Sequence, residues 1–258
     1  MDIVINIDHN YLPYAIVMLE SFFRHNQEES RVHLLHASMA EEDIGKLRQF
    51  VARYHGKLET YQVEESLFEG FPDLQRWSVE TLFRLLIPEV LPKHLERALY
   101  LDADVIVEKP LRQFYAMDFQ GKSMVVCRNT DGKVDEEEKN RIWKRKDGTA
   151  YFNAGVMLLN LEKMRQICSF ERYSQEVQNA HGLFPLLDQD LLNYVLGEDV
   201  LYMPASEYNC IVSPDSKNFS EDTAIYHFGT AQKPWGDRKP GRYYDVWWNY
   251  AESLSYCE

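Results

Sequence analysis

The first quarter of the chain alternates between short strand-like segments and segments with helical periodicity. Asp2–Ile7, Arg31–Ala37 and Lys57–Val63 have the pattern of strands. Between them, apolar residues recur at three- and four-residue spacing, which predicts two amphipathic helices. Strand, helix, strand, helix, strand is the order found in parallel sheets with right-handed crossovers. The predicted fold class is therefore α/β.

Shorter elements of both kinds continue along the chain. Ser78–Leu86 has a helical pattern that we expect to stop before Pro88, and Ala98–Leu101 has the pattern of a short buried strand. Further on, the sequence predicts a strand over Ser123–Cys127, an apolar segment over Tyr151–Leu161, a helix through Met164, Cys168 and Tyr173, and a helix containing Leu191, Leu192, Val195 and Leu196. No internal repeat or low-complexity linker divides the chain. We therefore expect a single domain over residues 1–258, with a nucleotide-binding half at about 1–120 and a substrate half at about 121–258.

The chain is acidic, with 41 Asp and Glu against 28 Lys and Arg among its 258 residues and a net charge of −13. Such a chain repels phosphate backbones, which argues against a general nucleic-acid binder. A nucleotide or sugar phosphate would need a metal ion or locally placed Lys and Arg side chains to bind. No apolar run reaches the ~18 residues of a membrane span, so we expect no transmembrane segment.

The N-terminus and the cysteines bear on the compartment. The N-terminal sequence MDIVINIDHNY has no basic region and has the pattern of a strand, so no signal peptide is expected. The cysteines Cys127, Cys168, Cys210 and Cys257 are far apart and form no CxxC pair. That spacing is typical of free thiols in a reducing cytoplasm and not of a disulfide scaffold or a zinc site. We therefore expect a cytoplasmic protein.

The common phosphate-binding and hydrolase motifs are absent from the sequence. Its 12 glycines form no GxG pair, which removes the Rossmann fingerprint and the glycine-rich kinase loop. Gly121-Lys122-Ser123 resembles the end of a P-loop, but Ala116 replaces the leading glycine and a strand follows, so we interpret the match as chance. GxSxG and HExxH do not occur, so nucleophile-elbow hydrolases and zincin proteases have no support.

Asp102-Ala103-Asp104 directly follows the short strand at Ala98–Leu101. In an extended backbone, residues two apart point the same way, so the two carboxylates can converge on one cation. Carboxylate oxygens suit magnesium or manganese, which also bind the oxygens of a diphosphate. In open α/β sheets, ligands bind beyond the carboxyl ends of the strands. From these residues alone, two interpretations stay open: a metal site, or two solvated aspartates in a turn.

A second group of polar residues follows the apolar segment Ala224–Tyr226, in the sequence His227-Phe-Gly-Thr-Ala-Gln-Lys233-Pro-Trp235. A histidine in this position is either a hydrogen-bonded core residue or a metal ligand. Gly229 permits close backbone approach, and Lys233 is a point charge suited to phosphate. An imidazole that joins two carboxylates would shift the metal preference from magnesium towards manganese.

Six motifs occur in the order found in glycosyltransferase family 8, and the chain resembles this family from Met1 to about Trp235. They are Asp8-His9-Asn10-Tyr11, Arg84, Tyr100-Leu-Asp-Ala-Asp104, Phe152-Asn-Ala-Gly155, Asp188-Gln-Asp190 and His227…Lys233-Pro-Trp235. The resemblance implies the GT-A fold, in which a Rossmann-like nucleotide-binding half with a mixed, mainly parallel sheet flanked by helices is fused to an acceptor-side half. It also implies a retaining, manganese-dependent enzyme similar to bacterial lipopolysaccharide galactosyl- and glucosyltransferases and to glycogenin.

The resemblance also implies roles for individual residues. The implied metal ligands are Asp102, Asp104 and His227. The implied nucleotide contacts are Asp8, Asn10, Tyr11, Asp102, Ala103, Asp104, Gly229 and Lys233, with Tyr11 stacking on the base. The implied donor-sugar contacts are Arg84, Asn153, Asp188 and Gln189, and the catalytic residues are Gln189, Asp188 and Arg84. Thr230 stands where the family usually has glycine, so the resemblance does not say which backbone N–H near Gly229 binds phosphate.

The implied activity is transfer of a hexose, glucose or galactose, from a UDP-sugar to a glycan, lipopolysaccharide or similar hydroxyl acceptor. Manganese is the expected cofactor, magnesium is the alternative, and peripheral contact with the inner face of the membrane stays open. Two other functions are open: a UDP-sugar hydrolase and a catalytically silent sugar-nucleotide-binding protein. Because Gln189 is a neutral amide and a poor nucleophile, we expect front-face displacement, in which the departing diphosphate takes the acceptor proton.

Several of these residues also have structural interpretations. Arg84 is either an exposed charge at a helix end or a fork for phosphate. We expect Asp188 both to cap the helix that carries Leu191 and to bind sugar. Asn153-Ala-Gly155 is expected to form a bulge that aims Asn153 at a ligand.

Two longer segments have alternative interpretations as well. Residues 131–147 carry six acidic and six basic side chains, which predicts a solvated loop or exposed helix, with a mobile lid as the alternative. Near the C-terminus, one helical face is aromatic, and we expect it to pack in the core, with a membrane anchor as the alternative. Its residues are Tyr243, Tyr244, Trp247, Trp248 and Ala251.

Overall fold

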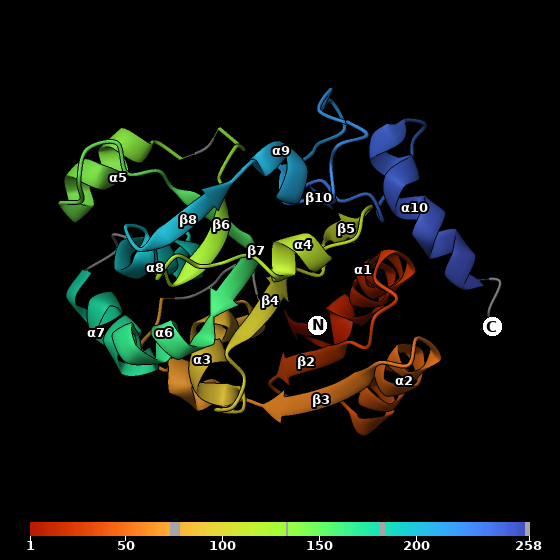
Figure 1. Cartoon of the computed structure of the whole chain (residues 1–258), viewed down its shortest axis with the longest axis horizontal. Helices are drawn as coiled ribbons and strands as arrows, with labels where there is room; N and C mark the ends of the chain where they lie inside the picture. The colour runs from red at the N-terminus through yellow and green to blue at the C-terminus, as the bar shows by residue number, and fades with distance from the viewer. Residues whose placement is uncertain (73–77, 133, 181–183, 256–258) are drawn as a thin grey trace.

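The computed structural model describes residues 1–72, 78–132, 134–180 and 184–255. A sheet of seven strands runs through the centre of this part of the chain, in the order β3-β2-β1-β4-β7-β6-β8 (Figure 1). The strands are β1 (Asp2–Asn6), β2 (Arg31–His36), β3 (Lys57–Gln62), β4 (Arg97–Leu101), β6 (Met124–Arg128), β7 (Phe152–Asn160) and β8 (Val200–Met203). β7 is antiparallel to β4 and β6, and the other neighbouring pairs are parallel. The sheet is therefore mixed and mainly parallel, as the GT-A expectation requires.

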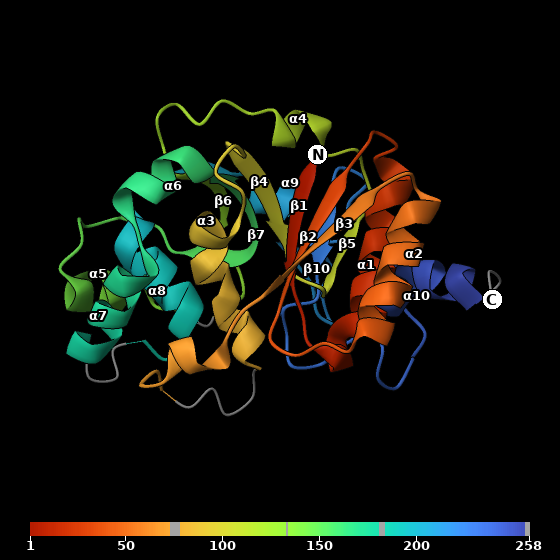
Figure 2. The ribbon, with the colours of Figure 1, turned by 90° about the horizontal axis from the view of Figure 1, so that it is seen from below.

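Helices cover both faces of the sheet (Figure 2). On one face lie α1 (Leu12–His25) and α2 (Glu41–Arg53), and on the other lie α3 (Ile87–Val90), α6 (Leu161–Ile167) and α8 (Leu187–Leu196). Because successive strand side chains point to opposite faces, Ile3 and Ile5 of β1 belong to the apolar cluster on the α1 side, and Val4 to the cluster on the α8 side. The three N-terminal strands each end one residue before the predicted boundary.

Two predicted helices differ in the structure. Ser78–Leu86 forms a 3₁₀ helix, η3 (Val79–Leu86), and α3 follows it directly, so the expected stop before Pro88 is wrong. Pro88 lies in the first turn of α3, where a missing N–H costs no intrahelical hydrogen bond. The helix expected through Met164, Cys168 and Tyr173 is two helices, α6 and α7 (Phe170–Ala180), because the backbone at Cys168 is extended.

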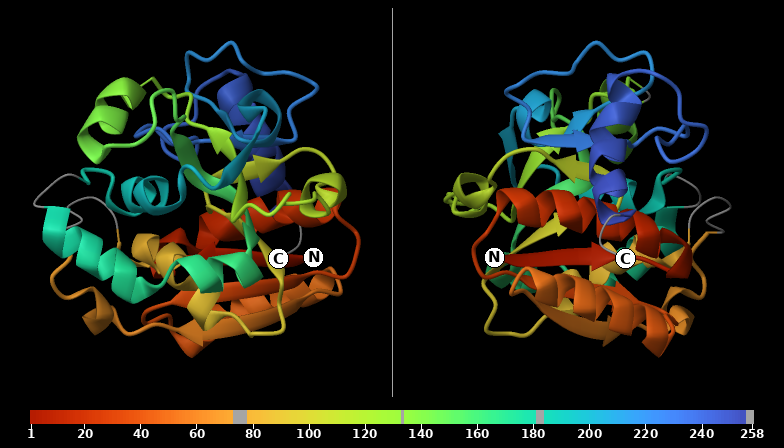
Figure 3. Two further views of the ribbon diagram at one scale, coloured as in Figure 1. Left: turned by 60° about the vertical axis from the view of Figure 1, so that its left-hand side comes forward. Right: turned by 90° about the vertical axis from the view of Figure 1, so that its right-hand side faces the viewer.

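A smaller sheet of three strands lies beyond the carboxyl end of β4, in the order β5-β10-β9. Its strands are β5 (Val105–Val107), β9 (Cys210–Ile211) and β10 (Ile225–His227). The C-terminal helix α10 (Arg242–Ser255) crosses over α1 beside this sheet (Figure 3). Tyr243, Tyr244 and Trp247 are buried there with Tyr226 of β10, and Trp248 and Ala251 pack against them half-buried, which confirms the core-packing prediction.

The other elements are η1 (His9–Tyr11), η2 (Glu65–Phe68), α4 (Arg112–Tyr115), α5 (Glu136–Trp143) and α9 (Ala205–Tyr208). Within the charged segment 131–147, α5 confirms the prediction of an exposed helix, although Trp143 is buried and packs against Tyr151. The lid interpretation stays a prediction.

The structure also bears on the cysteines and on membrane insertion. Cys127, Cys168 and Cys210 are buried free thiols, and Cys257 lies outside the described residues. Among the helices that the structure describes, none has both the length and the apolar character to span a bilayer.

Candidate active site

Asp102, Asp104 and His227 meet because two sheets end at the same point. Asp102 directly follows β4, and Asp104 precedes β5. β10 pairs antiparallel with β5 in a register that sets His227 opposite Val105, and the Phe228 N–H donates to the Asp104 carbonyl oxygen at 2.9 Å. Strand pairing alone therefore brings residues more than 120 positions apart in the sequence to one place.

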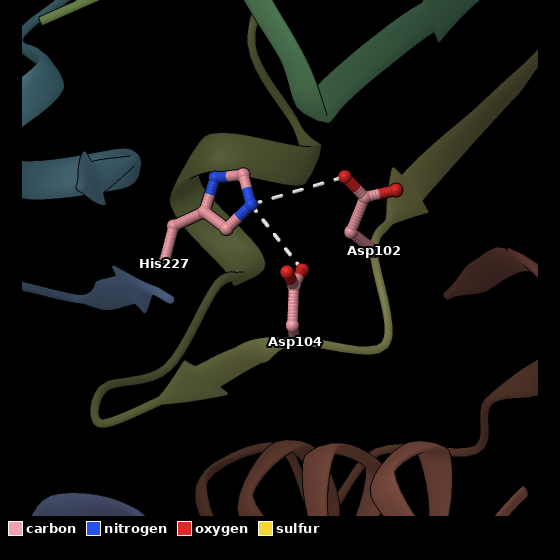
Figure 4. A group of neighbouring side chains, drawn as sticks. All are labelled: Asp102, Asp104 and His227. Atoms are coloured by element: carbon pink, nitrogen blue, oxygen red, sulfur yellow. Dashed lines mark ion pairs between the residues drawn. The ribbon is translucent and has the colours of Figure 1, made fainter. Parts of the chain in front are cut away.

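The three side chains form a compact group of potential ligands, which we call the ligand cluster. His227 Nε2 lies 3.2 Å from Asp104 Oδ1 and 3.8 Å from Asp102 Oδ2. One ligand atom from each residue lies within 4.8 Å of the other two. Figure 4 shows the Nε2 edge of the imidazole turned towards both carboxylates. Two carboxylate oxygens and one imidazole nitrogen form a donor set that suits a divalent cation of the magnesium and manganese kind.

Glycine at position 155 leaves the space in which this cluster packs. A Cβ atom there would lie 2.3 Å from His227 Cε1 and 2.7 Å from Asp102 Oδ2. Both distances are well below a van der Waals contact, so any larger residue would displace the cluster. Gly229 is also close, because a Cβ there would lie 3.0 Å from His227 Nε2. The two glycines therefore leave room for the side chains of the ligand cluster.

Lys233 places a positive charge next to the ligand cluster. Its Nζ donates to Asp104 Oδ2 at 2.6 Å and to the Phe228 carbonyl oxygen at 2.7 Å. Although burial alone would raise the pKa of Asp104, the Lys233 ammonium lowers it, and the pKa lies well below its usual range. Burial likewise lowers the pKa of Lys233, but the Asp104 carboxylate outweighs it and raises that pKa. Asp104 is therefore ionised, as a metal ligand must be.

Arg84 is buried and bridges two carboxylates, so its interpretation as an exposed charge is wrong. From η3, its guanidinium lies 3.0 Å from Asp102 Oδ1 through Nη2 and 3.1 Å from Asp188 Oδ2 through Nε. Nη1 donates to the Ala154 carbonyl oxygen at 2.9 Å. Despite the opposing effect of burial, the Asp102 carboxylate raises the pKa of Arg84. Because its nitrogens bind protein groups, Arg84 acts in this structure as a bridge and not as a free phosphate fork.

Asp188 does not cap its helix, contrary to our expectation. α8 begins at Leu187, its N-cap position is Leu186, and Asp188 lies inside the first turn, where its carboxylate faces Arg84. Burial raises the pKa of Asp188 to about 6, even though Arg84 opposes the shift. Although Asp188 is not the N-cap, its carboxylate lies in the first turn of α8, where an acidic group interacts favourably with the helix dipole.

The Asn153 bulge is confirmed by the register of β6 and β7. Val126 pairs with Met157, but the next residue, Cys127, pairs with Asn153. This register shift is the bulge, and Asn153 lies beside it, near Gln189 on α8. Gln189 Oε1 accepts from Asn153 Nδ2 at 3.1 Å and from the Ala154 N–H at 2.9 Å.

Four further residues hold the site, although the sequence predicted no role for them. The Tyr100 hydroxyl donates to Asp102 Oδ1 at 2.6 Å, and the period-two alternation of β4 was a usable signal, because it puts both residues on one face. Asn209 is hydrogen-bonded to His227 and Asn153. The Tyr151 hydroxyl accepts from Gln189 and donates to Asp190. Asp190 belongs to the motif Asp188-Gln-Asp190, which was a usable signal, whereas we find no local sequence signal for Asn209 and Tyr151.

The N-terminal residues lie near Lys233. Asp8 Oδ1 accepts from the Tyr11 N–H at 2.9 Å and caps η1, and Asn10 donates to Asp8 Oδ2. The Tyr11 side chain is 39% exposed and lies edge-on to Trp235, with 6.4 Å between the ring centroids. Its burial raises its pKa, and Lys233, Asp104 and Asp102 are the charges that act on it. An accessible aromatic ring therefore stands beside the cluster.

The sequence and the fold both match known proteins. Over residues 2–239, the chain matches the family described as Glycosyl transferase family 8. It is 27% identical to a lipopolysaccharide 1,2-glucosyltransferase of Escherichia coli, over 96% of this chain and 74% of that protein. It is 26% identical to the glycosyltransferase GlyD of Streptococcus pneumoniae serotype 4, over 96% of this chain but only 30% of that longer protein.

A solved structure supports the same fold assignment. The crystal structure of the galactosyltransferase LgtC in complex with donor and acceptor sugar analogues superposes with a TM-score of 0.85 and 25% identity. The match covers 98% of this chain and 96% of that one. The architecture is therefore the GT-A fold.

Proposed function

The chain belongs to glycosyltransferase family 8, and from that premise we propose that it is a retaining hexosyltransferase that depends on a divalent metal ion. In this proposal it moves glucose or galactose from a UDP-sugar to a hydroxyl group of a glycan, lipopolysaccharide or similar acceptor. The observation that carries the proposal is the ligand cluster, whose three ligand atoms lie within 4.8 Å of one another at the carboxyl end of β4. The names of the similar proteins, glucosyl- and galactosyltransferases, support a hexose as the transferred group.

Asp102, Asp104 and His227 would hold the metal, and the mixed oxygen and nitrogen donors favour manganese over magnesium. When bound there, the ion would supply positive charge opposite the diphosphate leaving group. Lys233 would add a second positive charge beside it. Near Lys233, Asp8, Asn10 and the buried Ala103 would line the nucleotide, and the accessible ring of Tyr11 would stack on the base.

The donor sugar would lie between the ligand cluster and α8, near Asn153, Asp188 and Gln189. Gln189 Oε1 already accepts two N–H groups of β7, so its oxygen is held by the protein and is not a free nucleophile. This supports a front-face reaction. The acceptor oxygen forms a bond to the anomeric carbon, the bond from that carbon to the diphosphate oxygen breaks, and the acceptor proton passes to the diphosphate. Arg84 keeps Asp102 and Asp188 in place during this exchange.

The same proposal places the nucleotide-sugar half at about residues 1–120 and the acceptor-side half at about 121–258. The ligand cluster draws on both halves, since Asp102 and Asp104 come from the first half and His227 from the second. A cytoplasmic location, with the acceptor at the inner face of the membrane, is part of the proposal. The buried free thiols support a reducing compartment.

The test is UDP release from UDP-glucose and UDP-galactose, with and without Mn²⁺, in the wild type and in Asp104→Asn. A matched control is Asp222→Asn, because the Asp222 side chain is fully exposed. We expect release that needs the metal, vanishes in Asp104→Asn and persists in Asp222→Asn. Release that does not increase with any added glycan acceptor would identify a hydrolase. Tight UDP binding without turnover would identify a binding protein, and a covalent sugar on Asp188, Gln189 or Asp190 would rule out front-face displacement.

A further inference from the structure

A continuous line of hydrogen bonds leads from the ligand cluster to the buried carboxylate of Asp190 on α8. His227 Nδ1 lies 2.8 Å from Asn209 Oδ1, and Asn209 Nδ2 donates to Asn153 Oδ1 at 2.9 Å. Asn153 Nδ2 then donates to Gln189 Oε1 at 3.1 Å. Asn209 therefore connects the imidazole to the two amide residues of the proposed sugar site. We call this series, from His227 through Asn209 and Asn153 to Gln189, the amide link.

The series continues behind Gln189. Gln189 Nε2 donates to the Tyr151 hydroxyl at 3.2 Å, and that hydroxyl donates to Asp190 Oδ1 at 2.7 Å. Asp190 is fully buried, and its Oδ1 also accepts from Lys139 Nζ at 2.8 Å. Each group in the series donates to the next, and the series ends on a carboxylate paired with an ammonium group.

Two backbone N–H groups fix the direction of this series, because a backbone donor cannot be reversed. The Gly155 N–H donates to Asn153 Oδ1 at 3.0 Å, so the atom at that position must be an oxygen. The Ala154 N–H fixes Gln189 Oε1 in the same way. Asn209 must therefore turn its NH₂ group towards Asn153 and its oxygen towards His227. An amide oxygen only accepts, so Nδ1 of the ring must carry the proton.

We propose that Asn209 is a positioning residue that holds His227 in the tautomer with the proton on Nδ1, which turns the Nε2 lone pair towards Asp102 and Asp104. The inference rests on the metal site of the proposed function. Without an acceptor at Nδ1, the ring proton would move to Nε2, where Asp104 Oδ1 at 3.2 Å accepts it. That tautomer cannot bind a metal through Nε2. Groups that orient a metal-binding histidine in this way typically change metal affinity by 10–100-fold when they are removed.

The test compares Asn209→Leu, which removes the acceptor, with Asn209→Asp, which keeps an acceptor for Nδ1 in nearly the same volume. The tautomer of His227 is measured by long-range ¹⁵N–¹H spectra of histidine-labelled protein without metal, with the His227 signals assigned by their loss in His227→Gln. The affinity for Mn²⁺ is measured from the free-ion signal in electron paramagnetic resonance. Asn26→Leu is the control, because Asn26 is also buried and hydrogen-bonded but lies at the C-terminal end of α1, bonded to Phe22 and Leu111.

We expect the wild type and Asn209→Asp to carry the proton on Nδ1. In Asn209→Asp a second oxygen replaces the NH₂ group that donates to Asn153 Oδ1, so this variant is expected to lose the bond to Asn153 but to keep the Nδ1 proton and to bind Mn²⁺ more tightly than Asn209→Leu. Asn209→Leu is expected to carry it on Nε2 and to bind Mn²⁺ about 10–100-fold more weakly. Asn26→Leu is expected to lower the melting temperature without moving either signal. The wild-type tautomer in a folded Asn209→Leu, or its loss in Asn209→Asp, would overturn the inference. A wild type that binds no Mn²⁺ would contradict the proposed function instead, and the tautomer would still decide the role of Asn209.

Discussion

The ligand cluster is joined to α8 by two neighbouring connections of opposite chemical character. The ionic link runs from Asp102 through Arg84 to Asp188, with contacts of 3.0 and 3.1 Å. The amide link runs from His227 through Asn209 and Asn153 to Gln189, the residue next to Asp188. One link consists of charged groups, of which Arg84 and Asp188 are buried, and the other of neutral amides and an imidazole.

The two links are therefore expected to contribute differently to stability and to the orientation of the ligand groups. Removing one partner of a buried ion pair leaves an uncompensated charge and typically costs 3–5 kcal/mol. A neutral hydrogen bond contributes only about 1 kcal/mol, but an amide has a fixed donor side and a fixed acceptor side. We therefore expect the ionic link to dominate stability and the amide link to dominate the orientation of ligand groups.

The most severe way to break the ionic link is Arg84→Leu. This change leaves Asp102 and Asp188 without their shared guanidinium, and we expect the free energy of unfolding at pH 7.5 to fall by about 3–5 kcal/mol. Guanidinium chloride denaturation measures the loss. Arg238→Leu is the control, since Arg238 forms an exposed pair with Glu252 and should change stability by less than about 0.5 kcal/mol. Equal effects of the two substitutions would contradict the role of the ionic link.

The Asp188 end of the ionic link predicts a dependence of stability on pH. Burial raises the pKa of Asp188 from the ordinary value of 3.8 to about 6, so the folded state binds this proton more tightly than the unfolded state. The contribution is present below about pH 4 and is lost as the pH rises through about 6, for a total of about 3 kcal/mol.

Asp188→Asn removes that titration. From pH 4 to pH 7, we expect the stability of Asp188→Asn relative to the wild type to rise by about 2 kcal/mol. Denaturation curves at half-unit pH intervals give this difference. Asp222→Asn should show a flat difference over the same range, and a flat difference for Asp188→Asn would contradict the raised pKa.

Gly155→Ala tests both links at their meeting point. The added Cβ would lie 2.3 Å from His227 of the amide link and 2.7 Å from Asp102 of the ionic link. We expect a loss of about 1–3 kcal/mol in stability from overpacking and weaker binding of Mn²⁺. Gly45→Ala in α2 is the control: a Cβ there meets no atom within 4 Å, so the same change should be stabilising by about 0.5–1 kcal/mol. Unchanged Mn²⁺ affinity in Gly155→Ala would show that the close packing is not needed.

The smallest change in stability is expected for the amide link, in Gln189→Met. Methionine fills a similar volume but leaves the Ala154 N–H without its acceptor, which costs about 1–2 kcal/mol. Because Gln189 lies at the sugar end of the link, we expect turnover to fall while UDP affinity in the presence of Mn²⁺ is retained. Gln175→Met, at an exposed position of α7, should change neither quantity. A fall in UDP affinity would mean that the amide link also contributes to nucleotide binding.

The parts of the fold that depend on local pattern could be predicted from the sequence. The strands at Asp2, Arg31 and Lys57 were predicted to within one residue, because burial of a strand face imposes its periodicity on the chain. The stop expected before Pro88 was wrong and the break at Cys168 was missed, since helical periodicity does not distinguish a 3₁₀ turn from an α-helical one, nor one helix from two.

The candidate site also contains residues that the sequence could predict and residues that it could not. Asp102, Asp104 and His227 could be predicted from their motifs, and the structure brings them together. Their roles stay proposals. The burial of Arg84 depends on contacts with residues up to 104 positions away in the sequence, and no local pattern encodes them. Asn209 was missed because its partner His227 lies 18 residues further along the chain and only the pairing of β9 with β10 brings them together.

In the proposed function, Asp102, Asp104 and His227 bind a metal ion that in turn holds a nucleoside diphosphate. Titration of UDP into the wild type and into Asp104→Asn, each with and without Mn²⁺, tests this claim without knowledge of the acceptor. We predict that Mn²⁺ tightens UDP binding at least about tenfold, or 1.4 kcal/mol, in the wild type and has no effect in Asp104→Asn. UDP affinity that is the same with and without Mn²⁺ in the wild type would contradict it.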